Sequence, residues 1–125
     1  MTTELLTIDA SEKVKKALEL MSEKNTGSII VMEKNAPVGI MTERDIARGL
    51  LAYKDIVNFP VHRIMSTPLI TAQSDLDVRK AVEVMVNKKI RRLPLVRDNK
   101  LVGILTSRDI FRWVTSPDFY FEDKS

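Results

Sequence analysis

The chain has 125 residues, of which 44% are hydrophobic and 30% are charged, and its formal net charge is +3. This length and balance predict one compact domain or two small, interlocked halves with a filled core. The absence of cysteine excludes disulfides and thiolate metal sites, and the single histidine, His62, argues against a metal centre built from imidazoles. The small basic excess does not favour a nucleic-acid partner, because strong nucleic-acid binders carry a dense basic stripe.

The sequence also lacks the marks of a membrane protein and of an enzyme. No apolar run is long enough to span a bilayer, and residues 1–4 carry no basic region of a signal peptide. The chain has no Ser/His/Asp set, no cysteine nucleophile and no glycine-rich phosphate loop followed by Lys-Ser/Thr. We therefore expect a cytoplasmic, non-catalytic protein without a membrane partner.

The first half of the chain predicts five elements in the order β-α-β-β-α. Asp9 and Ser11 are cap-type residues, and from Val14 onward apolar residues recur at i, i+3, i+4 and i+7, which is typical of an amphipathic helix. Two apolar runs on either side of a turn at 33–36 indicate a hairpin. The expected elements are a strand at 5–7, a helix that starts near Ser11, strands at 28–32 and 37–41, and a helix from 43 to about 51.

A linker at 53–68 joins the two halves. Pro60 and Pro68 interrupt any regular helix there, and one short helical turn is expected at 61–65. After the linker, an extended piece at 69–71 precedes a helix that we expect to be capped by Ser74 or Asp75.

The second half repeats the first. Residues 5–52 align with residues 69–116 without a gap, and seventeen positions are identical. Neither unit is long enough to bury its apolar face alone, so we expect the two to pack against each other. The predicted fold class is α+β, with two β-α-β-β-α repeats, 1–58 and 59–125, packed with pseudo-two-fold symmetry and helices on one face of each small sheet.

Each half ends in the same motif, in which a strand closes with Gly-Ile-x-Thr and a helix opens with x-Arg-Asp-Ile. Thr42-x-x-Asp45 and Thr106-x-x-Asp109 each fit a helix capping box, and for one isolated copy that interpretation is the commoner. The same geometry allows a second role. A carboxylate in the first turn accepts hydrogen bonds from ribose hydroxyls, while the Thr hydroxyl and the helix N–H groups favour a phosphate.

The duplicated motif resembles a tandem pair of cystathionine β-synthase (CBS) domains, also called a Bateman module. Two further stretches carry the resemblance: Ile64-Met65-Ser66-Thr67-Pro68 before the second repeat, and Arg91-Arg92-Leu93-Pro94-Leu95-Val96 within it. The match runs from about residue 5 to 115, although Met1 aligns with Met65, so the first repeat lacks the lead-in of the second. The resemblance implies a stand-alone regulatory module. It implies ligands such as AMP, ADP, ATP or S-adenosylmethionine in clefts between the repeats, and no required cofactor.

The resemblance also implies two clefts, each combining the Thr-x-x-Asp of one repeat with strands of the other. One cleft would hold Thr42, Arg44, Asp45, Thr71, Ile90, Arg91 and Arg92, and the other Thr7, Thr26, Gly27, Ser28, Thr106, Arg108 and Asp109. Arginine binds phosphate bidentately, although Arg91 and Arg92 fit a solvated surface pair equally well. Because the second cleft has Gly27 and Ser28 where the first has these arginines, we expect the first to be the better phosphate site.

Two partners follow from the resemblance: a second copy of the chain in a homodimer, and an effector protein that the sequence does not identify. Apolar residues in excess of a small core, on the helices from 43 and 107, fit a buried interface. Two alternatives stay open. One is a nucleic-acid-binding adaptor that uses the basic patch at Lys88–Arg92, and the other is a purely structural dimerisation module.

Overall fold

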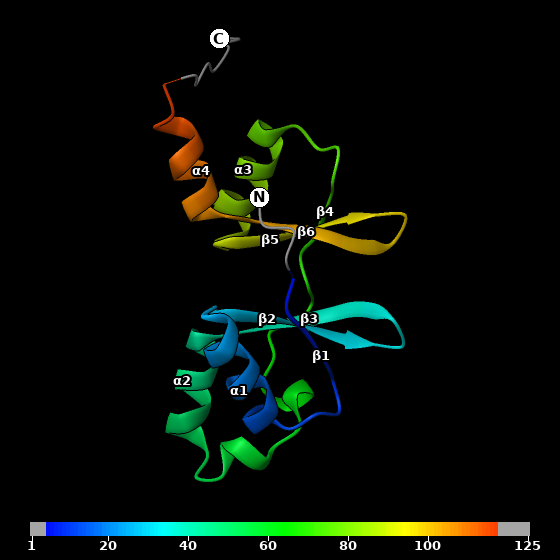
Figure 1. Ribbon diagram of the computed structural model, residues 1–125, viewed down its shortest axis with the longest axis vertical. Helices are drawn as coiled ribbons and strands as arrows, with labels where there is room; N and C mark the ends of the chain where they lie inside the picture. The colour runs from blue at the N-terminus through cyan, green and yellow to red at the C-terminus, as the bar shows by residue number, and fades with distance from the viewer. Residues whose placement is uncertain (1–4, 118–125) are drawn as a thin grey trace.

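The computed structural model describes residues 5–117 of the chain, and residues 1–4 and 118–125 lie outside the described part. Two units of the same topology stack along the long axis of the molecule (Figure 1). The first contains β1 (Thr7–Asp9), α1 (Val14–Lys24), β2 (Ser28–Glu33), β3 (Ala36–Thr42) and α2 (Glu43–Ala52). The second contains β4 (Ala72–Gln73), α3 (Val78–Lys88), β5 (Arg92–Arg97), β6 (Lys100–Thr106) and α4 (Ser107–Val114). The predicted β-α-β-β-α order of both repeats is confirmed.

Each unit builds one three-stranded sheet, in the order β1-β2-β3 or β4-β5-β6. The first strand pairs parallel with the second, and the second and third form the predicted antiparallel hairpin. Both hairpins have a register shift at the same point of the repeat, between Val31 and Met32 and between Leu95 and Val96. The duplicated sequence therefore produces duplicated geometry down to the bulge.

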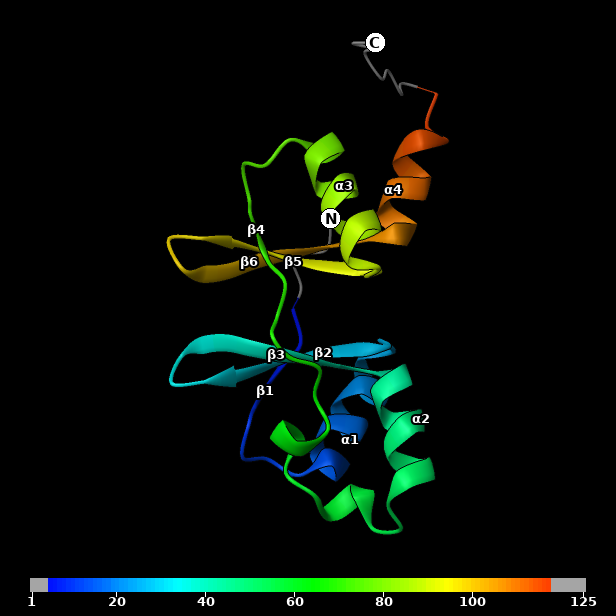
Figure 2. The same ribbon diagram turned by 180° about the vertical axis from the view of Figure 1, so that it is seen from behind.

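The two sheets face each other, and the helices lie on the outer faces (Figures 1 and 2). Helices α1 and α2 cover one sheet, α3 and α4 cover the other, and β3 contacts β6 across the interface. This arrangement confirms the α+β fold class with two packed repeats. It also brings the start of each closing helix close to the opposite repeat, which positions the site described below.

The first strands and first helices begin later than predicted. The strand expected at 5–7 is β1 at Thr7–Asp9, because its parallel register places Ile8 against Val31 in the core. The Asp9 carboxylate accepts a hydrogen bond from the Ser11 backbone N–H at 3.0 Å and another from the Ser11 hydroxyl, which forms a local turn. Helix α1 therefore starts after Lys13 without a side-chain cap.

The second repeat differs from its prediction in a related way. The extended piece expected at 69–71 is β4 at Ala72–Gln73, and the cap of α3 is Asp77, whose carboxylate accepts from the Arg79 N–H at 3.1 Å. Neither Ser74 nor Asp75 caps this helix. The Ser74 N–H donates instead to the carbonyl of Val96, so that Ser74 continues the edge of the sheet.

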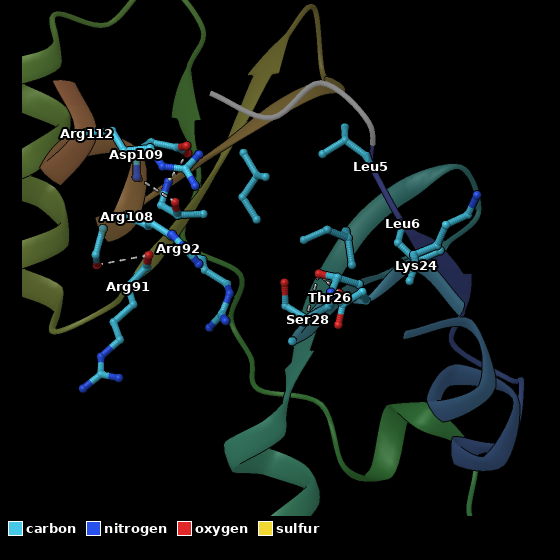
Figure 3. Close-up of a pocket in the computed structure, with 16 residues that line it drawn as sticks. Leu5, Leu6, Lys24, Thr26, Ser28, Arg91, Arg92, Arg108, Asp109 and Arg112 are labelled. Carbon is cyan, nitrogen blue, oxygen red and sulfur yellow. Dashed lines mark hydrogen bonds between the residues drawn. The ribbon is translucent and has the colours of Figure 1, made fainter. Parts of the chain in front are cut away.

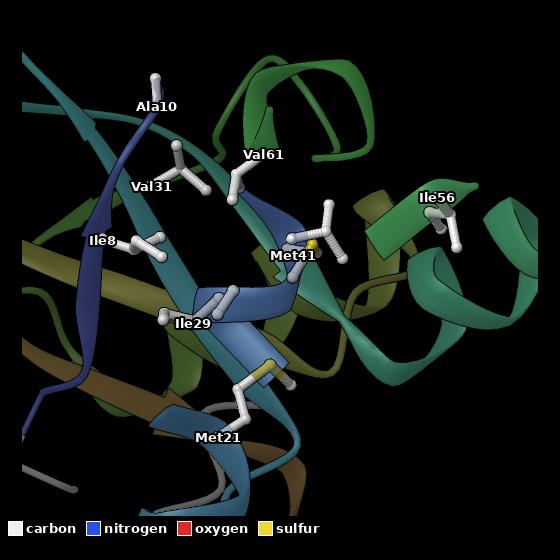
Figure 4. Close-up of a cluster of buried hydrophobic side chains, with 10 residues drawn as sticks. Ile8, Ala10, Met21, Ile29, Val31, Met41, Ile56 and Val61 are labelled. Carbon is white, nitrogen blue, oxygen red and sulfur yellow. The ribbon is translucent and has the colours of Figure 1, made fainter. Parts of the chain in front are cut away.

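The linker packs against the first unit and completes its core. Two short 3-10 turns, η1 (Ile56–Asn58) and η2 (Val61–Arg63), place Ile56 and Val61 in the cluster around Val31 and Met41 (Figure 4). The second turn matches the short helical turn expected at 61–65, whereas the first was not predicted. Since Val61 and His62 also donate to the backbone of residues 12 and 10, the chain from 59 to 66 lies with the first repeat.

Gly49 shows how closely the linker approaches α2. A Cβ atom at this position would lie 2.0 Å from Cδ1 of Ile56, which is itself buried. The equivalent residue of the second repeat is Trp113. Within residues 5–117, no helix is both long and apolar enough to cross a membrane.

Candidate ligand site

The two Thr-x-x-Asp motifs form complete capping boxes. The Asp45 carboxylate accepts from the Thr42 N–H at 2.9 Å, and the Thr42 hydroxyl accepts from the Asp45 N–H at 3.4 Å. The second copy has the same geometry, with 3.0 Å from the Thr106 N–H to Asp109 and 3.1 Å from the Asp109 N–H to Thr106. The motifs thus start α2 and α4 in identical fashion, and any functional difference between them comes from their surroundings.

Asp45 is enclosed by the protein. Its side chain is 8% exposed, and it is the buried charged residue of the described core. Oδ1 accepts a hydrogen bond from the Ser66 hydroxyl at 2.6 Å, and Oδ2 accepts from the Thr42 hydroxyl at 3.1 Å as well as from the Thr42 N–H. The carboxylate is therefore satisfied by the chain itself.

The linker holds Ser66 in this position. Ser66 and Ile40 exchange two backbone hydrogen bonds, of 2.8 Å and 3.2 Å, in an isolated bridge at the edge of β3. Next to it, Sδ of Met65 lies so close to Gly39 that a Cβ there would be 2.7 Å away. Residues 65 and 66 thus cover the strand that leads into Asp45.

A pocket of about 600 Å³ lies between the repeats on the Asp109 side. The segments that line it include the residues before β1, the loop between α1 and β2, the start of β5 and the start of α4 (Figure 3). The residues that line it are Leu5, Leu6, Lys24, Asn25, Thr26, Gly27, Ser28, Ile30, Arg91, Arg92, Ile104, Thr106, Ser107, Arg108, Asp109 and Arg112. This volume falls in the range of small-molecule sites.

The apolar residues and the arginines of the lining lie on different sides of the pocket. Leu5 and Leu6 lie on one side, and Arg92, Arg108 and Arg112 on the other (Figure 3). Arg92 reaches across toward the first repeat, since its Nη2 is 3.1 Å from the position a Cβ on Gly27 would take, and the Glu43 carboxylate lies beside the same position. Arg91 directs its guanidinium away from the other three arginines (Figure 3).

Backbone hydrogen bonds fix the frame around this lining. The Ser107 N–H and hydroxyl both donate to the carbonyl of Arg91, at 2.9 Å and 3.3 Å, which ties the start of α4 to the start of β5. In the first repeat the Glu43 N–H donates in the same way to the carbonyl of Gly27 at 3.1 Å. The start of each closing helix is therefore anchored to the residue that precedes the central strand of its own repeat.

The structure gathers part of the predicted site residues in this pocket and leaves others outside it. Those in the pocket are Thr26, Gly27, Ser28, Arg91, Arg92, Thr106, Arg108 and Asp109. Thr7, Arg44 and Thr71 are exposed, Thr42 and Asp45 are engaged in the covered capping box, and Ile90 lies in a separate groove between α3 and α4. The arginines that we assigned to the Asp45 cleft thus line the pocket of Asp109.

Sequence reasoning missed several lining residues, among them Leu5, Leu6, Lys24 and Arg112. The sequence does point to the two cations, because each is identical to its equivalent in the other repeat: Lys24 matches Lys88, and Arg112 matches Arg48. Arg112 follows Asp109 by three residues on α4, so the two share a helix face. For Leu5 and Leu6 there was no signal, since an apolar pair before a strand usually belongs to a core.

Two segments of the chain, residues 1–52 and 61–116, match the model of the CBS domain. The chain belongs to the CBS-domain family. One related sequence, the CBS domain-containing protein YhcV of Bacillus subtilis, is 36% identical over 110 residues, which cover 88% of this chain and 79% of that protein. An uncharacterised protein of Methanopyrus kandleri is 44% identical over 95 residues, or 74% of this chain, but the match spans only 48% of its own length.

Solved structures have the same fold. An uncharacterised conserved protein of Pyrococcus horikoshii matches with a TM-score of 0.82 and 30% identity, covering 98% of this chain and 92% of that one. A hexameric CBS-CP12 protein from bloom-forming cyanobacteria matches with a TM-score of 0.78 and 32% identity, covering 89% of this chain and 66% of that one. These matches confirm the tandem CBS resemblance that the repeated motif predicted.

Proposed function

We propose that this CBS pair is a regulatory module that binds an adenine nucleotide in the pocket beside Asp109. The observation that carries the proposal is the pocket itself, because it joins an apolar side, a carboxylate in the first turn of a helix and arginines from the start of β5 and from α4. These features suit the three parts of a nucleotide. No catalytic group and no cofactor is required for this function.

The geometry gives each part of the nucleotide a partner. Leu5, Leu6 and Ile104 offer apolar surface to the base. A carboxylate has several acceptor sites, so Asp109 accepts hydrogen bonds from ribose hydroxyls while it keeps the Thr106 N–H. The N-terminus of α4 and the arginines favour the negative charge of the phosphate.

The proposal places the ligand at Asp109 rather than at Asp45, which reverses the order expected from the sequence. Asp45 already accepts the Ser66 and Thr42 hydroxyls, so a ribose would have to displace the linker. Arg92, in contrast, extends toward Gly27 in the Asp109 pocket. Arg91 and Arg92, which have no charged equivalents in the first repeat, therefore line the cleft of Asp109 and not the cleft of Asp45 to which we assigned them from the sequence.

A ligand at this position would contact both repeats. The fraction of the protein in the ligand-bound arrangement would then rise with the ligand concentration. The ligand contacts residues from both units, and a ligand that prefers one relative packing of the units shifts the population toward it. Helix α4 lines the pocket with Arg108 and Arg112 and exposes Phe111 on another face. That exposed face, with Leu50 and Leu51 of α2, is the proposed surface for a second copy or for an effector protein.

Thermal unfolding with AMP, ADP and ATP tests the proposal. A nucleotide at a hundredfold excess over its Kd should stabilise the protein by about 2.7 kcal/mol. We expect the rise in Tm to disappear in Asp109→Ala and to persist in Asp45→Ala, measured relative to each variant without ligand. Arg44→Ala, on an exposed residue outside the pocket, provides a second control that keeps the capping box.

The opposite pattern, with the shift lost in Asp45→Ala and kept in Asp109→Ala, would show that the wrong cleft was chosen. The absence of a shift with every nucleotide would favour a purely structural dimerisation module. Displacement of the nucleotide by DNA or RNA, with a steep loss of affinity as salt increases, would favour the nucleic-acid adaptor.

A further inference from the structure

The charges of the pocket are unbalanced. Among the residues that the structure describes, its lining contains five cationic side chains, Lys24, Arg91, Arg92, Arg108 and Arg112, and one carboxylate, that of Asp109, while the Glu43 carboxylate lies beside Gly27 near Arg92. Even without Arg91, whose guanidinium points away, three arginines gather on one side of the pocket (Figure 3). Like charges in one partly enclosed space repel each other, so the free protein holds these cations at a cost that an anion would remove.

These arginines have spare hydrogen-bonding capacity. Within residues 5–117, no guanidinium of Arg92, Arg108 or Arg112 has a salt bridge or a side-chain hydrogen bond to another residue. Each guanidinium presents five N–H donors in a planar fork that matches two phosphate oxygens at once. Three such forks offer more donors than one terminal phosphate can satisfy.

A monophosphate therefore leaves part of the site unmatched. A nucleoside monophosphate carries about two negative charges at neutral pH, and each further phosphate adds about one more. Two or three phosphates in a chain would also spread their oxygens over the distance between β5, which carries Arg92, and α4, which carries Arg108 and Arg112. The number and spread of the cations thus fit a longer phosphate chain.

We propose that the pocket selects a nucleoside di- or triphosphate over the monophosphate, with the phosphate chain bound by Arg92, Arg108 and Arg112. This inference rests on the proposed function, since it specifies the ligand of the same pocket. The base and ribose contacts are common to all three nucleotides, so the preference comes from the arginines alone.

Isothermal titration calorimetry of the whole chain with AMP, ADP and ATP, at one ionic strength and with EDTA present, tests the preference. We expect ATP to bind at least about tenfold more tightly than AMP, because each additional charge-assisted contact is worth that much. ATP affinity should also fall more steeply with salt. Equal affinity for the three, or tighter binding of AMP, overturns this inference and leaves the proposed function intact.

A further titration separates the binding energy of the nucleoside from that of the phosphates. Inorganic triphosphate should bind more weakly than ATP, and equal affinity would overturn both the nucleoside preference and the proposed function. The absence of binding by every nucleotide overturns both as well.

The duplicated sequence supplies matched control variants. Arg108→Ala and Arg112→Ala should each lower ATP affinity about tenfold while changing AMP affinity by less. Arg44→Ala and Arg48→Ala remove the equivalent arginines of the first repeat, which do not line the pocket, and should leave both affinities unchanged. An equal loss of ATP affinity in both pairs would attribute the effect to net charge and overturn the proposed contacts. Circular dichroism of each variant checks that the fold is retained.

Discussion

The hydroxyl of Ser66 donates a hydrogen bond of 2.6 Å to Oδ1 of Asp45. Ser66 belongs to the linker and Asp45 to the first turn of α2, so this contact connects the start of a helix to a segment 21 residues further along the chain. The contact completes the set of donors around a carboxylate that is almost fully buried. Its consequence is that one of the two duplicated motifs is built into the protein interior, while the other lines a pocket.

The first prediction concerns this contact. Ser66→Ala should lower the free energy of unfolding by about 1–3 kcal/mol, because it leaves a lone pair of a buried carboxylate without its donor. Urea denaturation measures the loss. A double-mutant cycle with Asp45→Ala should give a coupling energy of similar size, whereas simple additivity would contradict the assigned partnership. Nucleotide affinity should not change, since neither residue lines the pocket.

The second prediction concerns Gly39, against which the linker packs. Gly39→Ala would place a Cβ 2.7 Å from Sδ of Met65 and 3.0 Å from the carbonyl oxygen of Ser66. The thioether can move, but Ser66 is held by its two hydrogen bonds to Ile40, so we expect a loss of about 1–3 kcal/mol. Hydrogen exchange should show faster exchange of the Ser66 and Ile40 amides. Unchanged exchange at both amides would mean that the chain accommodates the methyl group without opening the bridge.

The third prediction concerns the exposed apolar surface of α2 and α4. Leu51 is 91% exposed and Phe111 is 68% exposed in the single chain, which fits an interface with a second copy. The double variant Leu51→Glu/Phe111→Glu should therefore halve the mass measured by analytical ultracentrifugation, without changing the circular dichroism spectrum. A wild-type chain that is monomeric at high concentration would remove the basis for the proposed homodimer.

The fourth prediction concerns the response of Asp9 to pH. The hydrogen bond from the Ser11 hydroxyl, followed by that from the Ser11 N–H, lowers the pKa of Asp9 below its ordinary value of 3.8. Because the folded-state pKa is depressed, the stabilisation is present above the ordinary value and is lost as the pH falls through the folded pKa. Ser11→Ala should raise the pKa of Asp9 toward 3.8, as a carboxyl ¹³C NMR titration can measure. An unchanged pKa would show that the backbone N–H alone is responsible.

The local parts of the fold were accessible from the sequence because their causes lie within a few residues. Both capping boxes depend on residues three apart, and the hairpins depend on alternating apolar runs around a turn. The start of α1 was predicted less well, since Asp9 binds Ser11 and forms a turn before the helix begins. Several arrangements of the same cap-type residues are close in energy, and packing of the neighbouring strand decides among them.

The sequence alone determined that the protein consists of two like units and that each carries a Thr-x-x-Asp at the start of its closing helix, because a duplicated pattern repeats the same local physics. Only the tertiary structure decided which copy lines the pocket between the repeats. That difference depends on Ser66 reaching Asp45 from the linker and on Arg92 reaching toward Gly27 from the other repeat. Such contacts depend on how the chain packs in three dimensions, so two motifs of equal local sequence have different surroundings.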